Sequence, residues 1–408
     1  MLNPITNQRE LAYIVAIDKI SPIEGADRVE RAHVGGWQIM VKKGQFQPGD
    51  PAIYIEVDSK VPEEEPFMFL ASKHFKVKTQ KYFKGTVISQ GLLMAPEDFG
   101  WKVRHNEQDN MIYIINDKDS YILGDFLTET LKITYATDED NKRKASSEDK
   151  YKKMAQRRPN IFKKPWARWM MKREWGRRVM FFFFGKKKDK KNGWPAWVVK
   201  TDEERCQNMP WLFPGDPEEE WIATEKIDGT STTFTLRGKG RKEEFYICSR
   251  NVVFDRPDKG CYYDTNVYVE MAEKYDIYNI IKDIKEKFGL DFITLQGETY
   301  GEGIQKRDYG LKEHCFMAFN LIFGYIDGQV YRLNPIEMTE MLTKYKVPCV
   351  PIVNEHFVIP ETCDILLKIA EGNSKIDGGM REGLVFRSTD GVKSFKAVSN
   401  PFLLKYHS

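Results

Sequence analysis

Four stretches of the chain carry residue types that together suit attack by an amine on a phosphate. Lys226-Ile227-Asp228-Gly229 comes first, followed by Gly297-Glu298, by Glu382-Gly383-Leu384-Val385, and by Lys393 and Lys396. A lysine amine attacks only when it is deprotonated, and its reference pKa is about 10.4. A neighbouring cation, a desolvated pocket or a metal ion would have to lower that pKa. The order of these residues predicts Lys226 as a nucleophile toward the α-phosphate of ATP.

The residues of the Lys226-to-Gly229 tetrapeptide also have an ordinary structural interpretation. A Lys-x-Asp-Gly tetrapeptide alone is more often a surface turn, and the later glutamates and lysines favour catalysis. Asp228 lies two residues after Lys226 and, on a strand, would face the same side. It is either a water-mediated metal ligand or a turn-capping aspartate. Gly229 permits close approach of the backbone at a turn.

Composition describes a globular protein with several domains. The chain has 408 residues and 41% hydrophobic residues, which is enough for two or three domains. No apolar run approaches the roughly 20 residues of a membrane span, and the first residues show no signal-peptide pattern. Six cysteines form no Cys-x-x-Cys pair, so we expect no disulfide framework or zinc site. A reducing intracellular compartment fits best, with cytoplasm and nucleus not distinguished.

Positive charge is concentrated in the middle of the chain. Residues 142–191 contain 20 Lys or Arg and 4 Asp or Glu, a net charge of +16, whereas the whole chain carries +3. Such a concentration indicates a polyanionic partner such as nucleic acid; a solvated basic segment is the alternative. Pro165 is placed to open a helix, in which Trp166, Trp169 and Trp175 are interleaved with basic residues. Those tryptophans either pack against a neighbouring domain or contact nucleic acid, with an interfacial membrane helix as a minor option.

The chain divides into three regions by pattern. Residues 1–130 contain short β runs between Gly and Pro turns, at 10–17, 34–41 and 52–57, which is typical of a small barrel, or alternatively a sandwich. Residues 131–193 form a basic aromatic linker or insertion. Residues 194–408 alternate strands, expected at 230–236, 245–248, 292–296, 315–323 and 384–387, with a helix expected over 267–288. This predicts an α+β fold with a largely antiparallel sheet.

The motifs resemble those of the covalent nucleotidyltransferases, which include RNA ligases, DNA ligases and capping enzymes, over residues 194–408. The lead-in Trp194 to Asn208 and the segment Ser394 to Leu404 resemble RNA ligase family 5, whose members carry an amino-terminal OB module. The resemblance implies a small OB-like β-barrel followed by an antiparallel-sheet nucleotidyltransferase domain of the DNA/RNA ligase type, which is ATP-grasp-like. The segment 142–191 is then an addition or an expanded linker.

The resemblance also implies roles for individual residues. Lys226 would carry AMP, while Asp228, Glu298 and Glu382 would hold a metal ion. Glu298 is preferred over Glu302 because it directly follows a predicted strand. We expect Phe316 and Phe319 to face one side of their strand, so either ring is a candidate to stack on adenine, and core packing is the alternative for both. Lys393 is a candidate replacement for a second motif lysine, because Val398 stands where relatives carry one. The other implied nucleotide contacts are Glu225, Arg205, Arg250, Glu298, Phe319, Lys393 and Lys396, and Ser249 and Asn251 would meet the nucleic-acid end.

By resemblance, the function is ATP-dependent sealing of 3′-OH/5′-phosphate breaks in RNA through lysyl-AMP and RNA-adenylate. The implied cofactors are ATP and Mg²⁺ or Mn²⁺, and the implied partner is nicked duplex RNA or an RNA/DNA hybrid with RNA on the 3′-OH side. We expect a monomer. The rival functions are a DNA ligase, a GTP-using capping enzyme, and a non-catalytic RNA-binding protein.

Overall fold

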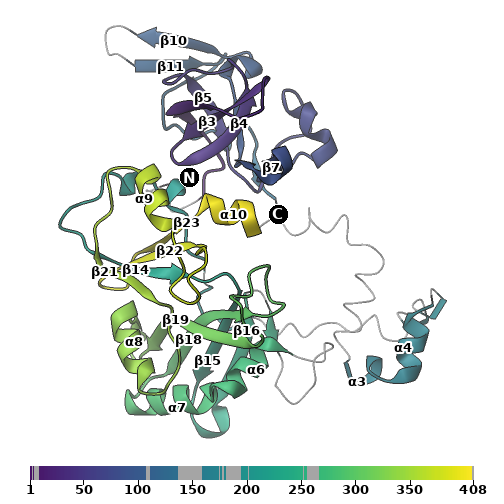
Figure 1. The fold of residues 1–408 in the computed structure, drawn as a ribbon, viewed down its shortest axis with the longest axis vertical. Helices are drawn as coiled ribbons and strands as arrows, with labels where there is room; N and C mark the ends of the chain where they lie inside the picture. Colours follow the sequence, from purple (N-terminus) through teal and green to yellow (C-terminus); the bar gives the residue numbers. More distant parts are fainter. Residues whose placement is uncertain are drawn as a thin grey trace.

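A computed structural model describes residues 1, 3, 9–106, 111–136, 159–173, 175–176, 179–180, 194–200, 202–250, 252–254 and 266–406. Figure 1 shows a sheet-rich amino-terminal domain at one end of the molecule and a larger domain of two sheets and several helices below it. The two helices of the basic segment lie to one side.

The amino-terminal domain is built from short antiparallel strands. One sheet has the order β1 (Ala12–Ala16), β5 (Pro51–Ile55) and β9 (Leu92–Met94), and a second has β2 (Lys19–Pro22), β3 (Val29–Val34) and β4 (Trp37–Lys42). Strand β5 is buried on both faces because Ile53 and Ile55 pack into one apolar cluster and Ala52 and Tyr54 into another. The strands expected near 10–17 and 52–57 are therefore confirmed. The remaining strands are β6 (Ser59–Lys60), β7 (Gln80–Tyr82), β8 (Val87–Ser89), β10 (Lys102–Asn106), β11 (Met111–Ile115), β12 (Ser120–Tyr121) and β13 (Thr134–Tyr135).

The larger domain contains two antiparallel sheets. The first has the order β21 (Ile352–Phe357), β14 (Trp221–Lys226), β22 (Gly383–Ser388) and β23 (Ser394–Val398). The second has the order β17 (Val253–Phe254), β16 (Glu244–Ser249), β15 (Thr230–Arg237), β18 (Phe292–Gly301), β19 (His314–Gly324) and β20 (Val330–Arg332). The predicted antiparallel α+β architecture is confirmed. A single turn connects β14 to β15, so the proposed nucleophile lies where the chain passes from one sheet to the other.

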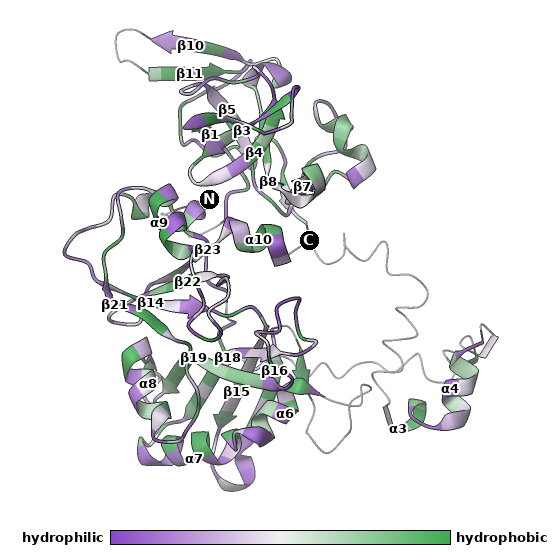
Figure 2. Cartoon of the chain, in the orientation of Figure 1, coloured by the Kyte–Doolittle hydropathy of each residue, from purple (hydrophilic) through white to green (hydrophobic). Residues whose placement is uncertain are grey.

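Helices cover the second sheet on one side (Figure 1): α6 (Val267–Lys274), α7 (Ile277–Lys287) and α8 (Pro335–Thr343). Figure 2 shows hydrophobic and hydrophilic stretches alternating on α7, where Ile277, Ile281 and Ile284 are buried in the core. The single helix expected over 267–288 is wrong, because Asp276 adopts a left-handed backbone with φ of 48° and separates α6 from α7. Helix α9 (Cys363–Ala370) packs on the first sheet, and α10 (Asn400–Tyr406) ends the described chain.

Short 3-10 helices complete the described elements: η1 (Phe67–Lys73), η2 (Phe83–Gly85), η3 (Pro96–Phe99), η4 (Cys206–Asn208), η5 (Pro210–Leu212) and η6 (Gly240–Lys242). Among the described helices, none has the length and hydropathy needed to cross a membrane.

Most of the basic segment 142–191 lies outside the described residues. Its described part contains α3 (Pro159–Phe162) and α4 (Pro165–Met171), and Pro165 opens α4 as expected. Trp166, Trp169 and Trp175 are 49%, 52% and 54% exposed, which contradicts packing of these rings against a neighbouring domain. The Arg173 guanidinium lies 3.7 Å from the centre of the Trp169 ring.

Among the described residues, the amino-terminal domain contacts the larger one near η4 and α9 and again at α10. The β3–β4 turn approaches η4 and α9 so closely that a Cβ on Gly36 would lie 2.7 Å from Cys363 Sγ and 3.1 Å from Gln207 Cγ. Elsewhere Lys81 Nζ, on β7, donates to the carbonyl oxygens of Leu403 and Leu404 in α10, at 2.6 and 2.8 Å.

Candidate active site

Lys226 and Glu382 meet because two neighbouring strands are in register. Lys226 is the last residue of β14 and lies opposite Gly383 of β22, which brings the preceding Glu382 to the lysine. The Lys226 Nζ to Glu382 Oε2 distance is 2.7 Å, and the two side chains are 25% and 8% exposed. Residues 156 positions apart thus form a half-enclosed ion pair at the junction of the two sheets.

Glu298 reaches the same place through the turn that follows Lys226. In the β15–β18 pair, Thr230 lies opposite Thr299 and Ser231 opposite Glu298. A Cβ on Gly229 would lie 2.3 Å from the Thr299 carbonyl oxygen and 2.9 Å from Glu298 Cγ, so only glycine allows this approach. Glu298 lies within β18 rather than after it, because that strand continues to Gly301.

The electrostatics of this cluster show an excess of negative charge. Burial alone would lower the pKa of Lys226, but the charges of Glu382 and Glu298 outweigh it and hold the pKa above its ordinary value. Burial raises the pKa of Glu298 to about 8, with Lys226 opposing and Glu382 and Asp228 adding to the rise. One lysine therefore faces three carboxyl groups, and a divalent cation would favour the ionised form of Glu298. Within the described ranges, no group of three His, Cys, Asp or Glu side chains is arranged closely enough to hold a metal ion directly.

Further cations lie on the other side of Lys226. Lys396 of β23 is 20% exposed, and its Nζ lies 3.5 Å from Asp202 Oδ1. Burial and the charge of Lys226 lower the pKa of Lys396. Arg250 Nη2 lies 2.6 Å from Asp202 Oδ2. One exposed carboxylate therefore touches two of the predicted phosphate-binding cations.

Arg205 is placed beside Lys396 by a strand-like pairing of the lead-in. Residues Arg205 and Lys396 form an isolated parallel bridge, and the Lys396 backbone N donates to the Glu204 carbonyl oxygen at 2.7 Å. The Arg205 guanidinium lies 5.8 Å from the centre of the Trp37 ring in the amino-terminal domain. Burial lowers the pKa of Arg205, with the charge of Glu382 opposing.

Other predicted residues are not brought into the cluster. Lys393 is 63% exposed and pairs with Glu219 at 2.6 Å. Glu225 faces away from Lys226, and its Oε2 accepts from the Lys375 backbone N at 2.7 Å. The buried Oε1 of Glu225 has no hydrogen-bond partner among the described residues. Ser249 ends β16, where its Oγ accepts from the Val252 backbone N at 3.2 Å, and Asn251 lies outside the described residues.

The two phenylalanines of β19 lie in different clusters, so the expectation that they share a face is wrong. Residues three apart on a strand point to opposite sides. Phe316 is fully buried in the core under the helices, with its ring 5.4 Å from that of Phe234. Phe319 is half-buried in a second cluster with Ile227 and Tyr309, next to the proposed nucleophile. This leaves Phe319 as the candidate for stacking on adenine.

Alanine substitutions should separate these two roles. Phe316→Ala is expected to lower the free energy of unfolding by about 3–5 kcal/mol, as for other buried aromatic rings. Phe319→Ala is expected to cost much less stability and to raise the KM for ATP about tenfold, since stacking on a base is worth about 1–3 kcal/mol. Chemical denaturation and ATP titration of both variants measure these effects. Equal KM values for the two variants would remove Phe319 from the base site.

Sequence reasoning missed two side chains that support the turn after Lys226. The Asp228 backbone N donates to the Tyr309 hydroxyl at 2.7 Å, and Gln305 Nε2 donates to the Gly229 carbonyl oxygen at 3.0 Å. Both belong to the loop that joins β18 to β19. The available signal was a polar run, Gln305 to Asp308, between two apolar strands; such a run is ordinarily a solvated turn.

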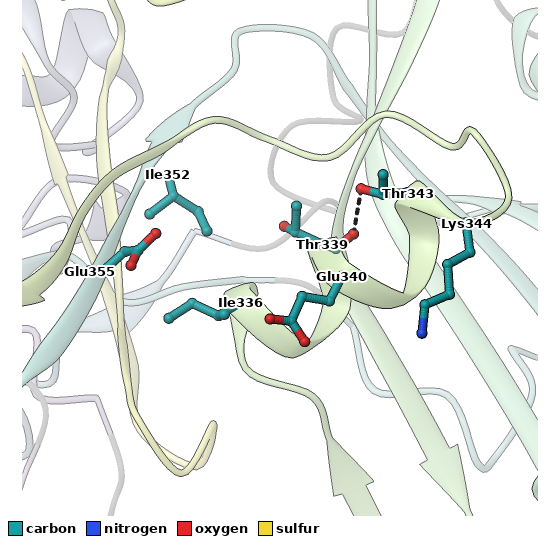
Figure 3. A pocket seen from close by; sticks show the side chains of 7 residues that line it. All are labelled: Ile336, Thr339, Glu340, Thr343, Lys344, Ile352 and Glu355. Carbon is teal, nitrogen blue, oxygen red and sulfur yellow. Dashed lines mark hydrogen bonds between the residues drawn. The ribbon is translucent and has the colours of Figure 1, made fainter.

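A separate pocket of about 630 Å³ lies between α8 and β21 (Figure 3). No predicted site residue lines it. Its lining consists of Ile336, Thr339, Glu340, Thr343, Lys344, Ile352 and Glu355.

Comparisons with known proteins agree with this arrangement. Residues 219–406 match the RNA ligase family, and residues 11–96 match an OB-fold domain. A Naegleria gruberi RNA ligase mutant solved with AMP and Mn is similar over 98% of this chain and 99% of its own, with 25% identity and a TM-score of 0.63. Another mutant of that ligase, solved with ATP and Mn, is similar over 98% of this chain and 100% of its own, again at 25% identity and 0.63. No curated protein matches the chain.

Fold and family together define a protein with an OB-fold domain and a nucleotidyltransferase domain of the ligase type. The part that matches the RNA ligase family, residues 219–406, contains both members of the Lys226–Glu382 pair. The resemblance found in the sequence is therefore confirmed, as is an OB-fold domain that precedes the catalytic one.

Proposed function

We propose that the protein is an ATP-dependent RNA ligase that seals 3′-OH/5′-phosphate breaks through lysyl-AMP and RNA-adenylate. The observation that carries the proposal is the Lys226–Glu382 pair at 2.7 Å, enclosed with Glu298 at the junction of the two sheets. A lysine held among carboxylates, with Lys396 and Arg205 beside it, suits attack on a nucleoside triphosphate.

In the first step, Lys226 Nζ forms a bond to the α-phosphorus of ATP as the bond to the β-phosphate oxygen breaks. Pyrophosphate leaves, and the amine proton passes to Glu382, which already accepts a hydrogen bond from the lysine. A divalent metal ion, when bound, supplies positive charge that favours the neutral amine and offsets charge on the phosphate. Asp228, Glu298 and Glu382 would hold Mg²⁺ or Mn²⁺ through its waters.

The remaining residues would bind the two substrates. Lys396 would contact the α-phosphate, Arg205 the leaving phosphates and Phe319 the adenine. Glu225, whose buried Oε1 has no hydrogen-bond partner in the part of the chain that the structure describes, would take a further nucleotide contact. Arg250 with Ser249 and Asn251 would meet the 5′-phosphate end of the nucleic acid. The exposure and ion pair of Lys393 give it the weakest support in this set.

The solved mutants of the N. gruberi ligase support these assignments. Besides an earlier lysine that has no counterpart among the residues proposed here, they alter, in chain order, an arginine, a lysine, an aspartate, two glutamates and a lysine. Arg205, Lys226, Asp228, Glu298, Glu382 and Lys396 are the same residue types in the same order. Three sequence separations are equal in the two chains. They are the separations between the arginine and the lysine that follows it, between that lysine and the aspartate, and between the second glutamate and the final lysine.

The proposed partner is nicked duplex RNA or an RNA/DNA hybrid, bound by a monomer. The OB-fold domain precedes the ligase domain, which favours an RNA ligase over DNA ligases and capping enzymes, in which such a module usually follows. The +16 charge of residues 142–191 would add salt-dependent affinity for the phosphate backbone.

Labelling and sealing assays test this proposal. We expect α-labelled ATP, and not α-labelled GTP, to label the protein covalently in the presence of Mg²⁺ or Mn²⁺. We expect sealing of nicks with RNA on the 3′-OH side and much slower sealing with DNA there. Labelling by GTP alone would indicate a capping enzyme, equal sealing with DNA on the 3′-OH side a DNA ligase, and no labelling by either nucleotide an RNA-binding protein.

A further inference from the structure

The turn that carries Asp228 and Gly229 is held from outside by a single loop. Two side chains of the β18–β19 loop bind opposite sides of this turn: the Tyr309 hydroxyl accepts from the Asp228 backbone N, and Gln305 donates to the Gly229 carbonyl. Backbone groups at the end of a strand need such partners when the sheet ladder no longer supplies them. The position of Asp228 relative to Lys226 therefore depends on the position of Tyr309.

Tyr309 is itself firmly fixed. It is 4% exposed, and its backbone has a positive φ of 56°, a conformation that persists only where the surroundings impose it. Its ring packs edge-on against Tyr300, with ring centres 5.2 Å apart. The Arg307 guanidinium lies over the Tyr309 ring, 4.2 Å from its centre.

Arg307 connects this loop to the end of the chain. It is 4% exposed, and its Nη2 pairs with Asp377 Oδ1 at 2.5 Å. The same guanidinium lies 6.0 Å from the Phe402 ring centre and 5.9 Å from that of Tyr406, both on α10. The buried guanidinium is thus within cation–π distance of one ring in the loop and two rings on α10.

Helix α10 is in turn held by the OB-fold domain, because Lys81 donates to the carbonyl oxygens of Leu403 and Leu404 in the last turn of the helix. A cation is favoured beside the carbonyl groups at the carboxyl-terminal end of a helix. A continuous series of contacts thus runs from β7 of the OB-fold domain through α10, Arg307 and Tyr309 to the backbone of Asp228.

We propose that Tyr309 is a positioning residue for the active-site turn, and that docking of the OB-fold domain on α10 through Lys81 holds Tyr309 in place. The inference deepens the proposed function, on which its catalytic consequence rests. It makes formation of lysyl-AMP dependent on the OB-fold domain, although that domain contributes none of the residues proposed to react with ATP.

Tyr309→Phe tests the first half of the proposal. The variant keeps the ring and removes only the acceptor for the Asp228 N–H. Amide hydrogen exchange of a peptide spanning residues 226–230 should become about tenfold faster, the size expected when a buried N–H loses its partner. The kcat of adenylylation should fall about tenfold, with the KM for ATP within about twofold of wild type. The matched control is Tyr278→Phe, whose hydroxyl binds Glu243 on the far side of the domain; unchanged exchange in Tyr309→Phe relative to this control would overturn the proposal.

Lys81→Met tests the second half, with Lys102→Met, on exposed β10, as control. Faster exchange at residues 226–230 and a lower kcat in Lys81→Met alone would support coupling through α10. Equal behaviour of the two lysine variants would overturn it. If wild-type protein formed no lysyl-AMP, the proposed function would fail, whereas hydrogen exchange would still report on these contacts.

Discussion

Lys226→Ala is expected to abolish covalent labelling of the protein by α-labelled ATP. Alanine has no amine, so no bond to the α-phosphorus can form, and sealing of 5′-phosphate ends should be lost with it. On a strand that already carries AMP at its 5′ end, the variant should retain some phosphodiester synthesis, because that step does not use the lysine as a nucleophile. Covalent labelling with ATP measures the first effect. Sealing assays on 5′-phosphate strands and on strands that already carry AMP measure the others.

Lys274→Ala is the matched control, since Lys274 also forms an ion pair, with Glu313 at 2.9 Å, but lies on α6 outside the cluster. It should label like the wild type. ATP-dependent labelling of Lys226→Ala at the wild-type level would refute the assignment of Lys226 as the nucleophile.

Glu382→Ala and Glu298→Ala are expected to lower the rate of adenylylation by about 10²–10³-fold, the loss typical when one preorganised electrostatic group is removed from an active site. In Glu382→Ala, Lys226 loses its ion-pair partner, and the metal ion loses a carboxylate that would help to hold it. Raising the concentration of Mn²⁺ should restore part of the rate if the carboxylates hold a hydrated ion. Metal titrations of each variant beside the wild type measure this.

The matched control is Glu313→Ala, because Glu313 also pairs with a lysine, at 2.9 Å, but outside the cluster. It should leave the metal dependence unchanged. Melting temperatures near that of the wild type would show that loss of rate does not come from unfolding, and wild-type activity of either glutamate variant would remove that residue from the site.

The order of the motif residues was predictable from the sequence, whereas their contacts were not. Lys226 and Glu382 lie 156 residues apart, and only the pairing of β14 with β22 shows why one carboxylate reaches the amine. The strand boundaries followed from local apolar patterns, so β15, β16, β19 and β22 are close to expectation. The prediction for Phe316 and Phe319 was wrong because it ignored the alternation of side chains along a strand. Tyr309 could not be predicted, because its role depends on a loop that folds back on a distant turn.

The contacts between the OB-fold domain and the ligase domain have a consequence for the segment that connects them in sequence. Gly36 and Lys81 contact the ligase domain directly. These contacts, and not only the connecting peptide, therefore fix the position of one domain relative to the other. If the proposed function holds, replacing the basic sequence between the two domains by a neutral one should therefore weaken nucleic-acid binding while leaving formation of lysyl-AMP nearly unchanged.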